Sequence, residues 1–190
     1  MPSEKVYGRE GPPQLRGRVE DIPPEDVPKF YGPEGLANWH LSVPESWTRR
    51  VRCACGAHDA FEVLTGSAEL PGWVGGKPYG TRRCDLRCTR CNDRFLLFDD
   101  GVHGNNAVLA DERSTLPPNY LEANAKILQP LACECGGRVF SVIVEVAYDC
   151  GDGLEDYPED QWDDAYGWFA ATARCPACGT LHDAANEETA

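Results

Sequence analysis

Eight of the ten cysteines stand in two sets that share one spacing, and this pattern constrains the fold more than any other feature. The first set is Cys53-Ala-Cys55-Gly56, followed at a distance by Cys88-Thr-Arg-Cys91. The second set is Cys133-Glu-Cys135-Gly136, followed by Cys175-Pro-Ala-Cys178-Gly179. Each set has two close pairs separated by an interval rich in strand-forming residues. We expect each close pair to sit on a tight turn, a knuckle, and the two knuckles of a set to present four thiolates to one metal ion.

The metal interpretation depends on the cellular compartment. Residues 1–5 lack the apolar core of a signal peptide, and the chain has no apolar run long enough for a membrane span. We therefore predict a cytoplasmic protein, in which disulfides are rare and paired cysteines are metal ligands. In a secreted protein the same ten cysteines could form five disulfides. Tetrahedral sulfur suits zinc and iron alike, and the ribbon-like intervals and the availability of the metal favour two structural zinc ions.

The composition agrees with a small protein that depends on metal. Of 190 residues, 42% are hydrophobic, 19 are glycine and 15 are proline, so one large apolar core is not expected. Structural zinc contributes on the order of 10 kcal/mol of binding free energy to folding, which compensates for small cores. We predict a mainly β, metal-stabilised fold.

The chain divides into four expected segments. They are a proline-rich extended arm over 1–48, a first β module over 49–110, a bridge with a short helix over 111–130, and a second β module over 131–190. The arm holds eight of the fifteen prolines. Its apolar residues favour packing on the β modules, with a partner-binding arm as the alternative; they are Phe30, Tyr31, Leu36, Trp39, Leu41 and Trp47.

Within these segments, local patterns predict individual elements. Strands are expected over 60–65, 94–98, 138–148 and 165–174, a long glycine-rich loop over 72–80, and a polar tail after His182 that frays. A short helix over 119–128 would be capped by Asn119, ended by Pro130, and would bury an apolar edge of Leu121, Ala125 and Leu128.

The two halves also match outside the cysteines. Phe61 corresponds to Phe140 with a one-residue gap, Val63 corresponds to Val142, and Arg87-Cys88 corresponds to Arg174-Cys175. A duplicated module accounts for these matches together.

The net charge of −13 is unevenly distributed. Residues 145–190 carry twelve acids against Arg174 alone, and eight of these acids lie within 149–164. This acidic segment is interpreted either as a solvated hairpin end or as a site for a basic protein, because clustered carboxylates repel one another. A calcium loop is weakly supported, since the required register is missing. The candidate partner residues are Asp152, Asp156, Tyr157, Asp160, Trp162 and Asp164.

Residues 49–98 have the opposite balance, with nine Arg and Lys against five Asp and Glu. Arginines around a knuckle can follow a phosphate backbone, so nucleic-acid binding is the alternative function. Its candidate residues are Arg82, Arg83, Arg87 and Arg90. The simpler interpretation is that these charges offset the thiolates or are solvated, and the negative total disfavours non-specific attraction to nucleic acid.

Several residues have expected supporting roles. Four thiolates around a divalent cation leave a formal charge of −2, so we expect Arg52, Arg87 and Arg90 near the first set and Arg174 near the second. Gly56, Gly136 and Gly179 would give the turns backbone freedom. Cys84 and Cys150 fall outside the repeat and are interpreted as ordinary reduced thiols. No catalytic residue is predicted.

The two cysteine quartets resemble those of the zinc-ribbon superfamily, in a tandem arrangement that covers about residues 50–110 and 131–182. The resemblance implies a metal and a shape but little about function, because zinc ribbons occur in many kinds of protein. A closed four-thiolate site has no open coordination position, which implies a structural metal. The leading hypothesis is therefore a non-catalytic interaction module, an adaptor or an immunity- or inhibitor-like protein, that offers its acidic surface to another protein.

Overall fold

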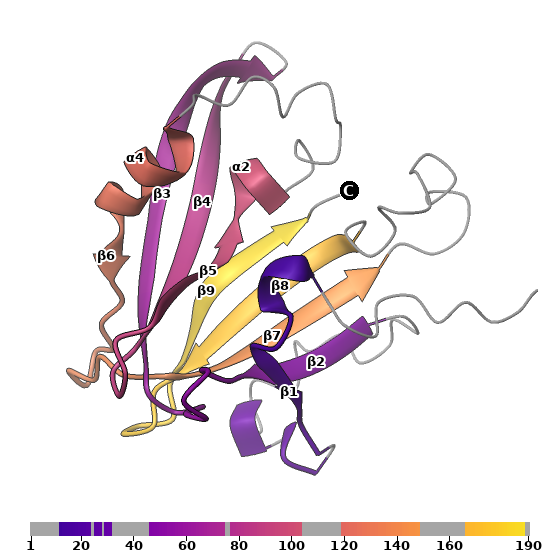
Figure 1. Cartoon of the computed structure of the whole chain (residues 1–190), viewed down its shortest axis with the longest axis vertical. Coiled ribbons are helices and arrows are strands. Elements are labelled where there is room, and N and C mark those ends of the chain that lie inside the picture. The colour runs from indigo at the N-terminus through magenta and orange to yellow at the C-terminus, as the bar shows by residue number, and fades with distance from the viewer. Residues whose placement is uncertain are drawn as a thin grey trace, which may run out of the picture.

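The computed structural model describes residues 12–23, 25–27, 29–31, 46–74, 77–103, 119–148 and 166–188. Within these residues the prediction of a mainly β protein is confirmed (Figure 1). The strands are β1 Val19–Asp21, β2 Ser46–Val51, β3 Phe61–Val74, β4 Lys77–Cys88, β5 Arg94–Asp99, β6 Gln129–Pro130, β7 Ser141–Tyr148, β8 Tyr166–Arg174 and β9 Leu181–Glu188. The helices are η1 Pro13–Leu15, α2 Asp100–His103 and α4 Tyr120–Ile127. None of the helices in the described ranges is long and apolar enough to cross a membrane.

The described strands form two sheets whose strand orders correspond. The five-stranded sheet has the order β1-β2-β7-β8-β9, and the four-stranded sheet has the order β5-β4-β3-β6. Every pairing is antiparallel. In each half of the chain a leading strand precedes a knuckle, a hairpin follows, a second knuckle comes next, and a last strand ends the unit. The two halves therefore share one order of elements.

The leading strand of each half joins the sheet of the other half. β2 lies before the first knuckle but pairs with β7, so that Arg49 faces Val144 and Arg50 faces Ile143. β6 lies before the second cysteine set but pairs with β3, where Leu64 faces Pro130. β2 also crosses the expected boundary between residues 48 and 49. The division into four segments stays a prediction, but the sheets themselves are built from both halves.

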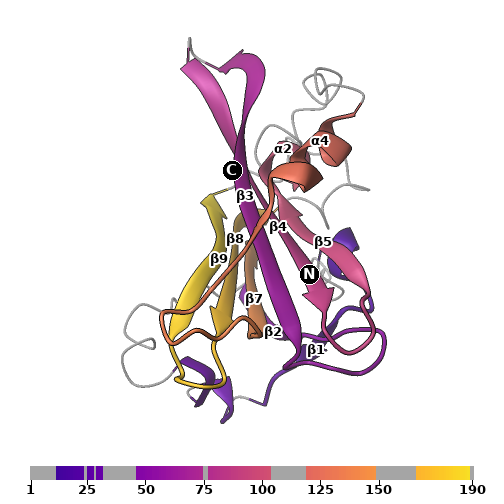
Figure 2. The same cartoon turned by 90° about the vertical axis from the view of Figure 1, so that its left-hand side faces the viewer.

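The β3–β4 hairpin corrects the expected loop over 72–80. Pairing continues to Trp73 opposite Pro78 and Val74 opposite Lys77, beyond a register shift between Leu70 and Trp73. Proline and glycine in this stretch indicated a loop, but an irregular pairing and the end of a hairpin both tolerate them. The hairpin extends past the rest of the molecule (Figure 2).

A single hydrophobic cluster joins the two sheets. It contains four phenylalanine rings that are fully buried, Phe61 and Phe98 from the first half and Phe140 and Phe169 from the second. The rings of Phe98 and Phe169 stack with their centroids 4.6 Å apart. The strands of the two sheets run at an angle to each other around this cluster (Figure 1). Burial of such rings supplies the main apolar contribution to stability in a small protein.

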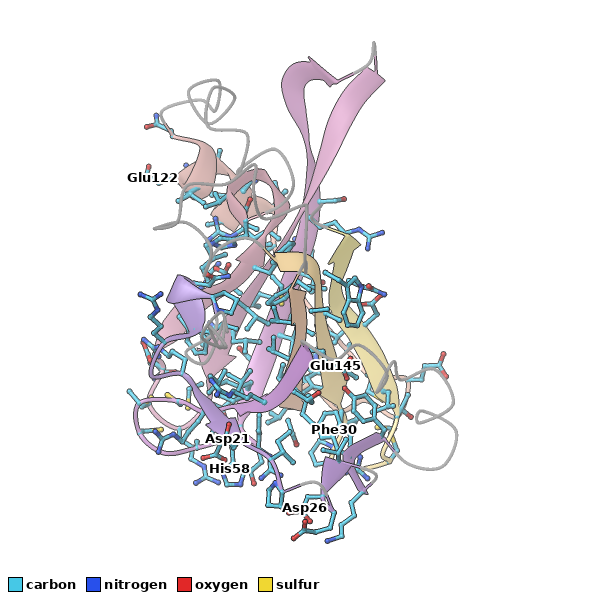
Figure 3. The ribbon with its side chains drawn as sticks, turned by 90° about the vertical axis from the view of Figure 1, so that its right-hand side faces the viewer. Asp21, Asp26, Phe30, His58, Glu122 and Glu145 are labelled. Carbon is cyan, nitrogen blue, oxygen red and sulfur yellow. The ribbon has the colours of Figure 1, made fainter. Side chains whose placement is uncertain are left out.

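The N-terminal segment packs on the five-stranded sheet as far as the structure describes it. Phe30 and Tyr31 are buried in a second cluster with Ile143, and the Tyr31 hydroxyl donates a hydrogen bond to Glu145. The rings of Phe30 and Tyr31 meet edge-on with their centroids 5.3 Å apart, and Phe30 and Glu145 are labelled in Figure 3. The expected packing of the N-terminal arm on the β structure is therefore found for Phe30 and Tyr31. Leu36, Trp39 and Leu41 lie outside the described residues, as does the side chain of Trp47.

The predicted helix is present as α4, but its expected apolar edge is only partly buried: Leu121 is exposed, while Ala125 and Leu128 are half-buried. Leu121 is 43% exposed, whereas Asn124 is 5% exposed. Asn119 occupies the N-cap position without a side-chain capping hydrogen bond. The helix is held partly by its backbone, because Arg83 donates a 2.6 Å hydrogen bond to the carbonyl of Leu121. The buried side of α4 therefore includes Asn124 as well as part of the expected apolar edge.

The end of the chain also differs from the prediction. Leu181–Glu188, expected to fray after His182, forms the edge strand β9 and pairs with β8 from Arg174 to Trp168. Ala185 is buried and Trp168 donates a 3.0 Å hydrogen bond from its indole nitrogen to Asn186. Polar composition hid this strand because only alternate side chains of an edge strand enter the core.

Candidate metal centres

Two groups of four cysteines are placed to hold a metal ion. We call Cys53, Cys55, Cys88 and Cys91 the first centre, and Cys133, Cys135, Cys175 and Cys178 the second centre. In each centre, one pair lies on the connection that crosses from one sheet to the other, and the other pair lies where the hairpin meets the last strand. All four knuckles lie at the same end of the molecule, the lower end in Figures 1 and 2.

The backbone of the knuckles is the same in both centres. The amide of Cys53 donates to the carbonyl of Ala57 at 2.7 Å, and the amide of Cys133 donates to Gly137 at 2.8 Å. In the other knuckles, Cys88 donates to Asp93 at 2.8 Å and Cys175 donates to Thr180 at 2.9 Å. These short hydrogen-bonded turns hold the two sulfur atoms of each pair close together.

The expected need for glycine in the turns is confirmed. Gly56, Gly136 and Gly179 have φ values of 85°, 86° and 79°, in the left-handed region that favours glycine. The fourth knuckle has Asn92 at the corresponding place, with φ 61°. Asparagine tolerates this conformation better than other residues with a side chain. The sequence pattern concealed the fourth position because it is not a glycine.

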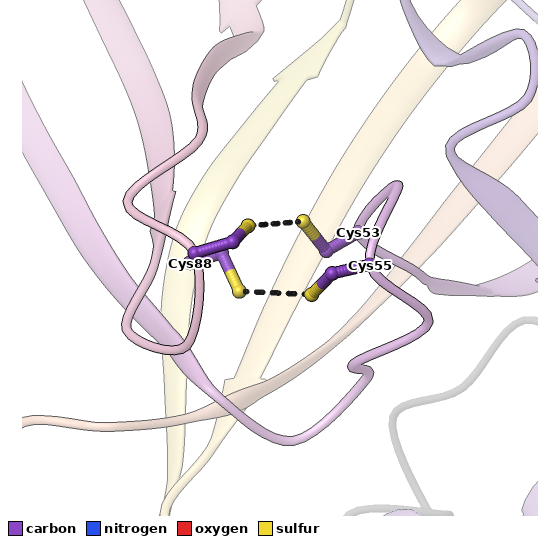
Figure 4. A group of neighbouring side chains, drawn as sticks. Cys53, Cys55 and Cys88 are labelled. Atoms are coloured by element: carbon purple, nitrogen blue, oxygen red, sulfur yellow. Dashed lines mark hydrogen bonds between the residues drawn. The ribbon is translucent and has the colours of Figure 1, made fainter.

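The sulfur atoms of each centre have the spacing of a tetrahedral site. All four lie within 4.8 Å of one another. In the first centre, the Sγ atoms of Cys53 and Cys91 are 3.4 Å apart, and those of Cys55 and Cys88 are 3.7 Å apart (Figure 4). A zinc ion with Zn–S bonds of about 2.3 Å requires sulfur–sulfur distances of about 3.8 Å. A disulfide would require about 2.05 Å.

The second centre has the same geometry. The Sγ atoms of Cys133 and Cys178 are 3.5 Å apart, and those of Cys135 and Cys175 are 3.6 Å apart. Gly137 leaves the room that this centre needs, because a Cβ there would lie 2.8 Å from the Cys175 sulfur. The residues present therefore fit a tetrahedral metal at both centres, and the sulfur set suits zinc or iron.

Each centre combines two buried and two exposed cysteines. The first cysteine of each pair is buried and the second is exposed; the exposed residues are Cys55, Cys91, Cys135 and Cys178. The metal would thus lie at the boundary between core and solvent. Four protein thiolates would complete its coordination, which is the arrangement of structural rather than catalytic zinc.

Hydrogen bonds distribute the acidity of the thiols unevenly. Burial opposes ionisation of Cys88, but the backbone N–H groups of Cys91 and Arg90 outweigh it and lower its pKa to about 7. The hydroxyl and then the backbone N–H of Thr180 lower the pKa of Cys178 to about 6. Burial raises the pKa of Cys53 to about 12. In each centre a thiol of the second pair is therefore the one most readily ionised for a cation.

The groups beside the two centres differ, and sequence reasoning missed them. Arg18 forms an ion pair with Asp93, and its guanidinium lies 4.3 Å from the centroid of the Phe95 ring. A carboxylate oxygen of Asp93 is 3.7 Å from the Cys53 sulfur. In the second centre Thr180 takes the corresponding place, with its hydroxyl oxygen 3.1 Å from the Cys178 sulfur. The sequence shows this difference five residues after the first cysteine of the second pair, where the first centre has Asp93 and the second centre has Thr180.

The arginines of the nucleic-acid alternative are engaged with carboxylates. Arg83 is buried and donates to both oxygens of Asp85 at 2.7 and 3.2 Å. Arg87 pairs with Glu62 and Arg90 pairs with Asp59. Arg82 is exposed at the edge of a hollow that Asp183 also lines. The structure therefore does not gather these four side chains into one free cationic surface.

Other predicted residues have simple outcomes. Cys84 is fully buried in the core, and burial raises the pKa of its thiol, as suits an ordinary reduced cysteine. Arg52 lies 3.8 Å from Glu20. Cys150 and the candidate partner residues lie outside the described residues; the latter are Asp152, Asp156, Tyr157, Asp160, Trp162 and Asp164.

Comparison of the chain with protein-family models, with curated proteins and with solved structures gave no match. The metal centres and the fold are therefore the basis for assigning a function.

Proposed function

We propose that this protein is a zinc-binding, non-catalytic module that binds another protein. The observation that carries the proposal is the closure of both centres: four sulfur atoms lie within 4.8 Å of one another in each. A zinc ion held by four protein thiolates has no position for water or substrate, so its role is to stabilise the fold. Iron is the less favoured occupant, because zinc is the usual metal of paired knuckles in ribbons.

The acidic segment is the proposed contact for a partner. It connects β7 to β8, and the last described pair before it is Tyr148 with Tyr166. β7 leads away from the second centre, so this connection starts and ends at the far end of the sheet from the knuckles. Metal-stabilised strands would thus carry the segment, and a basic protein is the partner that its charge favours.

Nucleic-acid binding is the weaker alternative. Of its four arginines, Arg83, Arg87 and Arg90 are already paired with carboxylates, which offsets their attraction to phosphate. It predicts binding of a mixed-sequence single strand at low salt that weakens in R87A/R90A. Absence of binding at low ionic strength would remove it.

The metal part of the proposal is tested by elemental analysis of the purified full chain. We expect about two equivalents of zinc, and loss of folded β structure in circular dichroism when a strong chelator removes the zinc. A chain without zinc or iron that stays folded in the chelator would refute a structural metal.

The partner part is tested by affinity capture from native cells, with the protein loaded with zinc. The charge-reversed variant D156K/D160K should lose a partner that the unmodified protein captures. The control E25K/E122K changes the net charge equally at exposed positions elsewhere, Glu25 and Glu122, and should keep the partner. Equal capture by both variants would count against the acidic segment as the contact.

A further inference from the structure

Each metal centre fastens one sheet to a strand that arrives from the other. Cys53 and Cys55 follow β2, a strand of the five-stranded sheet, and their ion would join them to Cys88 and Cys91 of the four-stranded sheet. The second centre does the reverse. Its first pair follows β6, in the four-stranded sheet, and its second pair lies between β8 and β9.

The two connections that carry the first cysteine pairs are hydrogen-bonded to each other. The amide of Phe61 donates to the carbonyl of Phe140 at 3.1 Å, and the amide of Phe140 donates back to Phe61 at 2.8 Å. These two residues form an isolated bridge between the sheets. Just beyond it, the amide of Leu131 donates to the carbonyl of Val63 at 2.8 Å. The backbone thus links both crossing points directly.

The bridge also reaches the metal ligands. Phe61 pairs with Cys88 across the β3–β4 ladder. On the other side, Ser141, the residue after Phe140, pairs with Arg174, the residue before Cys175. Four of the residues along this path have a relative exposure of 0%: Cys88, Phe61, Phe140 and Cys175. A continuous series of paired residues, with Ser141 and Arg174 half-buried, therefore runs from one centre to the other.

We infer that the two centres bind zinc cooperatively, because each ion orders the crossing point on which the other depends. Loss of the first ion releases the connection from β2 to β3, and β3 holds β6 and Phe140 in place for the second centre. Loss of the second ion releases the connection from β6 to β7, and β7 holds β2. The first ion to bind already orders both crossing points, so the second ion binds with a smaller loss of conformational entropy. This inference rests on the proposal that both centres hold zinc.

The test is a chelator titration of the zinc-loaded full chain, with the metal-free, one-zinc and two-zinc forms counted by native mass spectrometry. Independent and equal centres put half of the molecules in the one-zinc form at half saturation. A coupling of about a hundredfold lowers that share to about one tenth, and such a factor is within the usual range for linked sites.

A rare one-zinc form supports cooperativity. Because the two centres have the same four-cysteine ligand set, their intrinsic affinities are taken as similar. A one-zinc form that reaches half of the molecules or more then overturns cooperativity and leaves the zinc proposal intact. A chain that binds no zinc overturns both. The unmodified protein is sufficient for these outcomes, so they do not depend on whether a variant folds.

Two matched variants test reciprocity. C91S and C178S each remove one exposed ligand from one centre. We expect each to reduce the chelator concentration that strips the intact centre by a similar factor of about a hundred, since linkage is mutual. The control K126A changes an exposed residue of α4 and keeps all ligands, so it should leave both centres unchanged. An intact centre in C91S with the zinc affinity of the unmodified protein would overturn the coupling.

Discussion

Phe61 and Phe140 exchange two backbone hydrogen bonds, of 3.1 and 2.8 Å, at the point where the two halves of the chain cross. The two residues were matched in the sequence as equivalent positions. Their ring contacts are equivalent too, because Phe61 meets Phe95 edge-on at 6.1 Å and Phe140 meets His182 edge-on at 5.5 Å. The fold thus pairs corresponding residues of the two halves through their backbones.

This bridge should be among the most protected parts of the backbone. In hydrogen exchange of the zinc-loaded protein, we expect the amides of Phe61 and Phe140 to exchange only through global unfolding, since both residues are fully buried. Partial chelation should increase the exchange of both amides together. Fast exchange of either amide in the loaded protein would contradict the role given to the bridge.

Gly137 should be essential to the second centre, whereas its counterpart Ala57 is not restricted in this way. A Cβ at Gly137 would lie 2.8 Å from the Cys175 sulfur, so G137A must displace a metal ligand. We expect the zinc affinity of the second centre to fall by about tenfold or more, as for other changes that move ligands. The control A57G removes a methyl group at the corresponding buried position and should keep the zinc affinity of the first centre. Competition with a chromogenic chelator measures both.

Tyr31 should make stability depend on alkaline pH. Burial and then the charge of Glu145 raise the pKa of Tyr31 above its ordinary value. The group with the raised pKa contributes stability that is fully present below about pH 10, the ordinary tyrosine pKa, and that is lost as the pH rises further. The free energy of unfolding, from urea denaturation, should therefore fall above about pH 10 more steeply in the unmodified protein than in Y31F.

At neutral pH, Y31F removes the donor of a buried hydrogen bond to Glu145. It should lower the free energy of unfolding by about 1 to 3 kcal/mol. Identical pH profiles of the two proteins would show that the Tyr31 hydroxyl is not buried as described.

The buried arginine should matter for folding and the exposed one should not. Arg83 is 9% exposed and neutralises Asp85, while Arg90 and Asp59 have side chains that are 62% and 51% exposed. R83L leaves the buried Asp85 with Arg94 as its remaining arginine partner, 2.8 Å away, and should cost about 1.5 to 3 kcal/mol for the lost charged hydrogen bonds. R90A should cost less than about 1 kcal/mol. Urea denaturation of both zinc-loaded variants measures the difference, and similar costs would contradict the structural role of Arg83.

The cysteine spacing predicted the composition of both centres, because the cysteines of a pair are close in sequence and the repeat of one spacing indicated which pairs belong together. The strands next to the second centre were predictable from their composition, because β7 and β8 are apolar runs that pair with each other. The helix α4 was found from its local pattern, but its buried face was not. Arg83 and Arg94, which donate to the helix carbonyls of Leu121 and Ala125, lie far from the helix in the sequence, so the local pattern did not reveal that Asn124 is buried.

The exchange of leading strands could not be predicted. The stretch Ser46–Val51 mixes polar and apolar residues without a strict alternation, and nothing local specifies β7 as its neighbour. Arg18 was equally hidden, because its contact with Asp93 joins residues far apart in the chain. Pairings of this kind are set by the packing of the whole molecule.

Because β2 pairs with a strand of the other half, it cannot take its place in the sheet at the time it is synthesised. β2 leaves the ribosome early, but its neighbour β7 follows only after the whole first half has been made. Long-range pairing of this kind slows folding and leaves strand edges open to other chains in the meantime. A product cut short after residue 110 would keep β2 with β1 at one edge and without β7 at the other, and we expect it to aggregate rather than to work as a smaller unit.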